Sequence, residues 1–414
     1  MHKGVKQLPA RWAAAVFVET SNVPVSRERI PVGLLYSGTG LYGAVGQEML
    51  RGALLGLEEV NAWVSTDFVL EPLIADPSGR LRGYYEACDA MLRQHRAMHL
   101  VGCYTSAARR QVLPLVEAAD ALLWHPARYE GFESSESVIY VGAAPNQHVV
   151  PLARYMLQHI ASSVYCIGSH YIWTWETARV LREMLGATGG HMAAERTLPL
   201  GETSVEHVVE EIVRLRPGVV FNTLVGQSSY AFFRAYHAAR LRDPHASLPP
   251  ILSCSLCEPE LQIIGAEAGA GHIACSPWFQ SLDTLENRVF LGRYRERFGP
   301  GSSPSVDAQA SYTCMLLLGR AIKAAGSADV AAVRRALYRD SFRAPQGAIC
   351  VDPDNNHTYA TPRIARSNLA GQFDLLWESP ALVRPDPYLV WLDQALSEHS
   401  EVSAPPRRHL RIVS

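Results

Sequence analysis

The feature that most constrains the fold of this chain is an apolar run that stops at hydroxyl-bearing residues. A helical repeat and a second apolar run follow it. The first run, residues 99–104, stops at Thr105 and Ser106. Residues 106–119 repeat apolar side chains at helical spacing, and a second apolar run over residues 121–125 ends before a proline. A strand, a helix and a strand in this order form a βαβ unit, whose crossover requires a parallel sheet.

The same alternation recurs along most of the chain. Strand-like and helix-like segments alternate from about residue 31 to residue 145, and a second series of similar size starts near residue 163. At 414 residues the chain exceeds the roughly 250–300 residues at which single cores stop growing. We therefore predict an α/β fold with two doubly wound parallel-sheet lobes rather than one large sheet.

Candidate ligand-binding residues lie where the predicted strands end. Tyr104, Thr105 and Ser106 close one strand and open the next helix, whose N-terminal N–H groups can hold a carbonyl oxygen or an anion. Tyr171 and Trp173 follow a strand of the second series and would form an aromatic pocket wall. Ligands bind beyond the carboxyl ends of parallel strands, so these residues predict a small-molecule site. The alternatives are a Ser106 that only caps its helix and rings that pack in the core.

No pattern in the sequence predicts catalysis or a metal centre. G-x-S-x-G, G-x-x-x-x-G-K-[ST] and H-E-x-x-H are absent. The three glycines of residues 36–43 lack the dinucleotide spacing, and the histidines do not cluster at metal-ligand spacing. Cys254 and Cys257 form a lone C-x-x-C, for which we expect a structural role. We therefore expect no catalytic residue, no metal and no cofactor.

The net charge limits the kinds of partner that the protein can bind, and the two ends of the chain indicate its cellular compartment. A formal net charge of -2 provides no field for nucleic acid or an anionic membrane surface. No apolar run reaches the length of a transmembrane helix. Glu19 interrupts an apolar run that resembles a stunted signal peptide, so we expect a disordered leader over residues 1–29 and a cytoplasmic protein, with a periplasmic one as the alternative. Residues 393–414 are expected to form a solvated tail.

Several short strings carry a resemblance to a known family. VGCYTS (residues 101–106), YEGFE (129–133), APNQ (144–147) and DNNH (354–357) resemble, in this order, the amide-sensing regulators of aliphatic amidase operons. Those regulators belong to the type I periplasmic-binding-protein superfamily, together with binding proteins for branched-chain amino acids and urea. The resemblance covers the chain from about residue 30 to residue 391.

The resemblance implies two discontinuous lobes joined by a three-strand hinge. The crossings are expected near Pro145, Pro277 and Pro345. The N-terminal lobe would then comprise residues 30–145 and 277–345. The C-terminal lobe would comprise residues 146–276 and 346–392.

The resemblance also implies a ligand site built from both lobes. His125 and Arg128 stand where the family has a tyrosine and a proline, so an imidazole and a guanidinium take the place of other groups. A preference for ligands other than the smallest amides is expected to follow. The expected ligand-binding residues are, from the first lobe, Tyr104, Thr105, Ser106, His125 and Arg128, and, from the second, Tyr171, Trp173, Thr223 and Val225.

We therefore expect a non-catalytic protein that closes on a small amide, urea-like or amino-acid-like molecule. The resemblance implies a ligand sensor that acts as a negative regulator of an amidase-type operon through an RNA-binding antiterminator partner. The main alternative is the substrate-binding protein of an importer for branched-chain amino acids, urea or amides. An enzyme on a two-lobed scaffold is the second alternative. Homo-oligomers are compatible with the sequence, which has no feature that specifies one.

Overall fold

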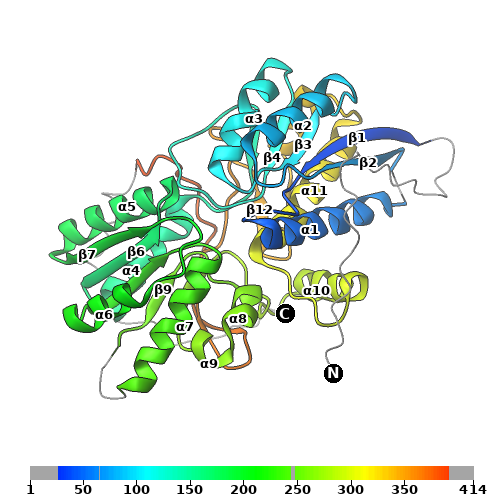
Figure 1. Ribbon diagram of the computed structural model, residues 1–414. Helices are drawn as coiled ribbons and strands as arrows, with labels where there is room; N and C mark the ends of the chain where they lie inside the picture. The colour runs from blue at the N-terminus through cyan, green and yellow to red at the C-terminus, as the bar shows by residue number, and fades with distance from the viewer. Residues whose placement is uncertain (1–26, 65, 244–247, 391–414) are drawn as a thin grey trace, which may run out of the picture.

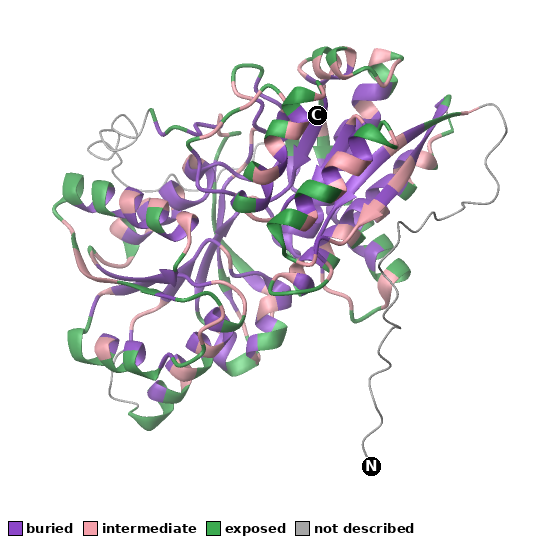
Figure 2. Ribbon diagram, turned by 45° about the horizontal axis from the view of Figure 1, so that its top comes forward, coloured by how far each residue is buried: buried purple, intermediate pink, exposed green. Residues whose placement is uncertain are grey.

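Two α/β lobes, each built around its own sheet, make up the described part of the chain (Figure 1). The computed structural model describes residues 27–64, 66–243 and 248–390. Buried residues gather in the two sheets and on the helix faces that cover them, while the outer helix faces are exposed (Figure 2). The predicted fold class, two doubly wound α/β lobes, is confirmed.

The first sheet is entirely parallel, in the order β2-β1-β3-β4-β5. Side chains alternate between its faces, so Leu100 and Leu123 enter one apolar cluster while Val101 and Trp124 enter the other. Its strands and the helices that alternate with them are β1 (Glu28–Leu35), α1 (Gly43–Asn61), β2 (Phe68–Ala75), α2 (Leu81–Arg93), β3 (His99–Gly102), α3 (Ser106–Ala118), β4 (Leu122–His125) and β5 (Val138–Tyr140).

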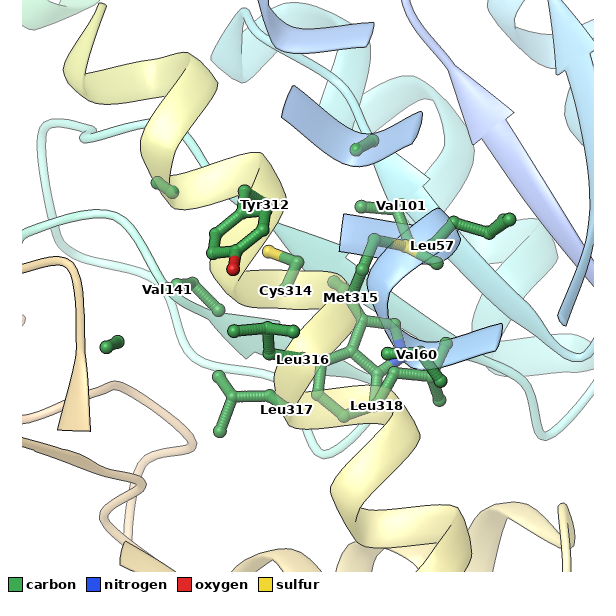
Figure 3. Packing of buried hydrophobic residues seen from close by; sticks show 14 of the residues in the cluster. Leu57, Val60, Val101, Val141, Tyr312, Cys314, Met315, Leu316, Leu317 and Leu318 are labelled. Atoms are coloured by element: carbon green, nitrogen blue, oxygen red, sulfur yellow. The ribbon is translucent and has the colours of Figure 1, made fainter. Parts of the chain in front are cut away.

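Three later helices return to cover the first sheet: α10 (Leu285–Phe298), α11 (Val306–Ala325) and α12 (Val330–Leu337). The core of this lobe depends on a close approach of α1 and α11. Leu57 and Val60 of α1 come together with Met315 and Leu318 of α11 (Figure 3).

Glycine permits that approach. A Cβ atom on Gly52 would lie 1.9 Å from the carbonyl oxygen of Ala308, and one on Gly56 would lie 2.7 Å from that of Tyr312. Neither backbone oxygen can move without shifting α11, so the missing side chains set the distance between the two helices.

The second sheet has seven strands in the order β14-β13-β10-β9-β8-β6-β7. The predicted parallel pattern holds from β10 to β7, but β13 and β14 add an antiparallel pair at one edge. Apolar clusters again lie on both faces. The elements are α4 (Val149–His159), β6 (Ser163–Ser169), α5 (Ile172–Thr188), β7 (His191–Leu198), α6 (Glu206–Leu215), β8 (Val219–Thr223), α7 (Gln227–Arg242), β9 (Ile251–Ser253), α8 (Glu258–Ile264), α9 (Ala266–Gly269), β10 (Ile273–Ser276), β13 (Arg363–Ser367) and β14 (Phe373–Glu378).

Three segments connect the two lobes. The first runs from β5 to α4 and contains the short helix η1 (Pro145–Gln147). In the second, between β10 and α10, Trp278 joins the core of the first lobe and Phe279 joins that of the second. The hairpin of β11 (Ser341–Ala344) and β12 (Gly347–Cys350) packs through Ile349 on the core of the first lobe. We therefore propose that the third crossing follows this hairpin, beyond the position near Pro345 that was expected.

Two side chains link these crossings to one another. Gln147 donates from Nε2 to the carbonyl oxygens of Thr358 (3.0 Å) and Val383 (2.9 Å), which ties the first crossing to the third. Arg363 donates to the carbonyl oxygens of Gln346 (3.0 Å) and Pro277, which ties the third crossing to the second. The hinge is thus cross-linked by hydrogen bonds.

The last residues of the expected leader, 27–29, belong to the fold, because β1 begins at Glu28. Arg27 already belongs to the fold, since its guanidinium donates to the carbonyl oxygens of Asn61 (3.0 Å) and Thr66 (3.0 Å). The rest of the expected leader and the expected tail lie outside the described residues. Within the described ranges no helix is long and apolar enough to cross a membrane. Cys254 and Cys257 are buried and unbridged, as are most of the other cysteines.

Candidate ligand-binding site

A pocket of about 50 Å³ lies between the lobes, beyond the carboxyl ends of strands from both sheets. Its position agrees with the rule that ligands of open parallel sheets bind at this edge. Figure 1 shows the two lobes facing each other there. The lining residues are Tyr42, Tyr104, Thr105, Ser106, Arg128, Tyr129 and Glu130 from the first lobe, and Tyr171, Trp173, Val225 and Ser255 from the second.

Most of the residues expected from the sequence come together in this pocket. Tyr104, Thr105, Ser106 and Arg128 line it from the first lobe, and Tyr171, Trp173 and Val225 line it from the second. His125 and Thr223 do not line it. Each of these two residues lies one layer behind the pocket wall.

Ser106 has a different local role from the helix cap that was the alternative interpretation. Thr105 is the N-cap of α3, and its hydroxyl accepts a hydrogen bond from the Ala108 N–H at 3.1 Å. Ser106 is the first helical residue, so its hydroxyl is not needed for capping. It donates instead to the carboxylate of Glu130 at 2.5 Å.

One hydrogen bond joins the two walls of the pocket. The backbone N–H of Ser106, in the first lobe, donates to the hydroxyl of Tyr171, in the second, at 2.8 Å. Burial raises the pKa of the Tyr171 hydroxyl, which therefore keeps its proton at neutral pH. Because the oxygen already accepts the Ser106 N–H, this proton is left for donation.

Charged side chains behind the pocket hold Glu130 in place. Arg110 donates to Glu130 at 3.0 Å and to Glu133 at 3.2 Å. Arg109, which is 0% exposed, donates to Glu133 at 2.6 Å and places its guanidinium 4.6 Å from the ring centre of Tyr129. Burial alone would raise the pKa of Glu133, but the hydrogen bonds and charge of Arg109 lower it to about 2. These paired contacts hold the Glu130 side chain in one orientation.

His125 belongs to that supporting layer, which corrects the expectation that it contacts the ligand. It is the last residue of β4, and alternation places it on the same face as Leu123, under α3. One ring nitrogen contacts the Gly102 carbonyl oxygen at 3.2 Å and the other contacts Arg109 at 3.1 Å. Burial and the neighbouring Arg109 lower its pKa to about 3, so the imidazole is neutral.

In the second lobe, Trp173 forms part of the pocket wall and Thr223 supports it. Trp173 is 6% exposed, and in the described part of the chain its indole N–H has no hydrogen-bond acceptor. Thr223 is buried at the end of β8 and donates to the Ile167 carbonyl oxygen at 3.2 Å. Thr223 therefore holds neighbouring strands together, and Trp173 is the residue of this pair that lines the pocket.

Arg128 lines both the pocket and an adjoining chamber of about 100 Å³, referred to below as the outer chamber. Its guanidinium is paired with Asp307 at 3.1 Å. Glu48 of α1 and Glu260 of α8 line the outer chamber from opposite lobes. Burial raises the pKa of each of these two carboxyl groups to about 7.

Four lining residues were not expected from the sequence: Tyr42, Tyr129, Glu130 and Ser255. Each follows the end of a strand, at β1, β4 or β9, so the rule that indicated Tyr104 and Tyr171 applies to them too. Tyr129 and Glu130 also lie within the string YEGFE. Among the described residues no group of histidine, cysteine, aspartate and glutamate side chains is arranged to hold a metal ion.

Solved structures of similar fold are solute-binding proteins. A solute-binding protein of an R. palustris ABC transporter, in complex with 4-hydroxybenzoate, superposes with a TM-score of 0.76 at 19% identity, covering 88% of this chain and 100% of that one. A leucine-binding protein of Thermotoga maritima gives a TM-score of 0.71 at 16% identity, covering 85% and 99%. At these identities the likeness establishes the fold.

One curated protein shares a local similarity. The chain is 33% identical over 126 residues to a protein named limonene hydroxylase from Geobacillus stearothermophilus, covering 30% of this chain and 23% of that protein. The chain thus spans under a quarter of that relative's length. A family model described as the periplasmic binding protein domain matches residues 30–394. Because this match covers most of the chain, the protein belongs to the periplasmic binding protein family.

Proposed function

We propose that the protein captures a small polar solute between its lobes and releases it unchanged, as the solute-binding component of an importer. One observation supports this most directly: the pocket takes its walls from both lobes, and Ser106 and Tyr171 already meet across it. A ligand that touches both walls stabilises the closed form, because it gains contacts that the open form lacks.

The polar groups of the pocket favour a small, neutral ligand. The charges that line it are compensated, Arg128 by Asp307 and Glu130 by Arg110. The Trp173 indole N–H and the Tyr171 hydroxyl offer donors to a carbonyl oxygen. An amide or a urea meets these requirements, and the outer chamber gives room for a ligand larger than the smallest amide.

The importer role draws support from the solved structures of similar fold. Those proteins are described as ABC transporter solute-binding proteins and, in one case, as a leucine-binding protein. Ser106 donates to a carboxylate that Arg110 engages, an arrangement that orients the hydroxyl rather than activating it as a nucleophile. Closure on the ligand therefore involves no chemical step in this proposal.

A second candidate is a cytoplasmic amide sensor that negatively regulates an amidase-type operon. The hydroxyl groups of Tyr104, Ser106 and Tyr171, which the resemblance to amide-sensing regulators implies for the ligand site, line the same pocket. In that case the closed and open forms would differ in their affinity for an RNA-binding antiterminator. The ligand chemistry is shared by the two candidates, and the cellular output differs.

A thermal-shift screen of amides, ureas, amino acids and hydroxybenzoates tests ligand capture. A ligand present at a hundred times its dissociation constant stabilises the fold by roughly 2.7 kcal/mol. A screen without any stabilising solute would contradict the proposal, as would release of ammonia from amides by rigorously purified protein. N-terminal sequencing of the native protein separates the candidates: a processed, exported chain supports the importer role, and a full-length cytoplasmic chain that co-purifies with an RNA-binding protein supports the sensor.

A further inference from the structure

We propose that Glu130 is a positioning residue that sets the direction of the hydrogen bond at Ser106, so that the pocket selects ligands with an N–H group beside a carbonyl and rejects carboxylates. This inference rests on the proposed function, because it concerns the solute that the pocket captures. It assigns a role to a residue that the sequence analysis did not include in the site.

The geometry at Ser106 leaves its hydroxyl one role toward a ligand. A serine hydroxyl has one proton to donate and two lone pairs with which to accept. The proton is directed to Glu130 Oε2 at 2.5 Å. The Ser106 oxygen therefore faces the pocket as an acceptor, and it requires an N–H or O–H donor from the ligand.

The orientation of the Glu130 carboxylate is fixed by its neighbours. Arg110 donates to its other oxygen, Oε1, at 3.0 Å, and Arg109 lies 3.9 Å from the same atom. The side chain of Glu130 is 1% exposed. Both carboxylate oxygens thus have fixed partners, and the orientation of the Ser106 hydroxyl is fixed with them.

The opposite wall supplies the complementary groups. Tyr171 accepts the Ser106 backbone N–H, which leaves its own proton to donate, and the buried Trp173 N–H also needs an acceptor. An acceptor at Ser106 facing donors at Tyr171 and Trp173 matches the NH₂ and C=O groups of a primary amide or a urea. A carboxylate presents two acceptors and a negative charge to the same wall as Glu130, so it is disfavoured twice.

Replacing Glu130 by glutamine tests the direction of this bond. In Glu130→Gln, the oxygen of the introduced amide would still accept from Arg110, while its NH₂ group would donate to Ser106 and turn the serine proton into the pocket. The probes are two matched sets, acetamide, acetone and acetate, and benzamide, acetophenone and benzoate. Within each set only the group beside the carbonyl changes. Calorimetry on the parent protein should favour the amide over the neutral ketone by about tenfold, and Glu130→Gln should bring this ratio close to one.

Two further variants separate hydrogen-bond direction from charge and from folding. Glu117→Gln removes an exposed negative charge near the far end of α3 and leaves Ser106, Glu130 and the two arginines unchanged, so its amide-to-ketone ratio should equal the parent's. Ser106→Ala removes the acceptor itself and should also lower the ratio to near one. If Glu130→Gln does not fold, Ser106→Ala and Glu117→Gln still test whether the Ser106 oxygen sets the ratio.

Three outcomes would overturn the proposal. The first is a parent ratio of one, the second is a Glu130→Gln ratio equal to the parent's, and the third is an equal loss in Glu117→Gln. In each of these cases, a solute that stabilises the protein in the wider thermal-shift screen would still support the proposed function, which is ligand capture. If neither the six probes nor the wider screen gives a ligand, the proposed function fails together with this inference.

Discussion

The Ser106 N–H reaches the Tyr171 hydroxyl at 2.8 Å, and the two residues belong to different lobes. Tyr171→Phe removes this link and the hydroxyl donor to the ligand. We expect it to weaken binding of the best ligand by about tenfold or more, because an unmade buried hydrogen bond costs about 1–3 kcal/mol. Calorimetry measures the affinity, and small-angle scattering should show a more open unliganded protein. Tyr155→Phe, on α4 and outside the pocket, is the control and should change neither quantity.

Ser106 and Thr105 are expected to separate ligand binding from helix stability. Ser106→Ala should weaken binding about tenfold and leave the helix cap intact, since its hydroxyl does not cap α3. Thr105→Ala removes the cap and should lower the free energy of unfolding by about 1 kcal/mol. Denaturant unfolding and calorimetry on both variants test the assignment. Unchanged affinity in Ser106→Ala, or an unchanged free energy of unfolding in Thr105→Ala, would contradict it.

Because α1 and α11 are in close contact, adding a single methyl group between them should lower the free energy of unfolding. Gly52→Ala places a Cβ atom 1.9 Å from the Ala308 carbonyl oxygen and should destabilise the fold by about 1–3 kcal/mol. Gly186→Ala is the matched control, because no atom lies within 4 Å of its Cβ position in α5. That change should stabilise the fold by roughly 0.5–1 kcal/mol. Similar unfolding curves for the two variants would show that the helices can separate without cost.

Glu48 should make stability depend on pH. Burial raises its pKa from 4.5 to about 7, so between these values the folded protein binds more protons than the unfolded chain. The contribution of Glu48 to stability is therefore full below about pH 4.5 and declines as the pH rises through 7. Glu48→Gln should flatten the fall in melting temperature between about pH 5.5 and 8. Glu58→Gln, a half-exposed carboxylate on the same helix, should leave the fall unchanged, and an equal effect of both would refute the prediction.

Trp173→Ala should impair binding by removing the pocket wall from the second lobe. Trp173 is part of α5, and its indole packs in an apolar cluster of the second lobe as well as lining the pocket. Truncation to alanine therefore also leaves a cavity, which should lower the free energy of unfolding by about 3–5 kcal/mol. Trp173→Phe retains most of the wall and loses the indole N–H. The phenylalanine variant should keep most of the stability but lose affinity for carbonyl-bearing ligands. Unchanged affinity in Trp173→Phe would exclude the N–H as a ligand contact.

The alternation of strands and helices could be predicted from the sequence, because each βα unit buries apolar side chains that recur with the period of its own strand or helix. The residues at strand ends were readable for the same reason, and Tyr104 and Tyr171 lie in the pocket. The sequence does not show on which face of the sheet the last residue of a strand lies, because a one-residue shift moves a side chain to the other face. For this reason His125 was expected in the pocket, whereas it lies under α3 beside Arg109.

Neighbouring residues of similar chemistry were a second obstacle. Thr105 and Ser106 can both cap a helix, and only the backbone dihedral angles decide between them. The antiparallel pair β13–β14 and the position of the β11–β12 hairpin depend on contacts with segments distant in the chain. Such contacts leave no local periodicity to read.

The hydrogen bonds of Gln147 and Arg363 across the three crossings limit how the lobes can move. Three separate linkers would allow the lobes to twist and slide as well as to close. Linkers that are tied to one another must bend together, which leaves rotation about a single axis as the soft motion. The angle between the lobes then depends on the solute, because the size of the molecule in the cleft sets how far the lobes rotate. A partner protein that contacts both lobes would bind according to that angle.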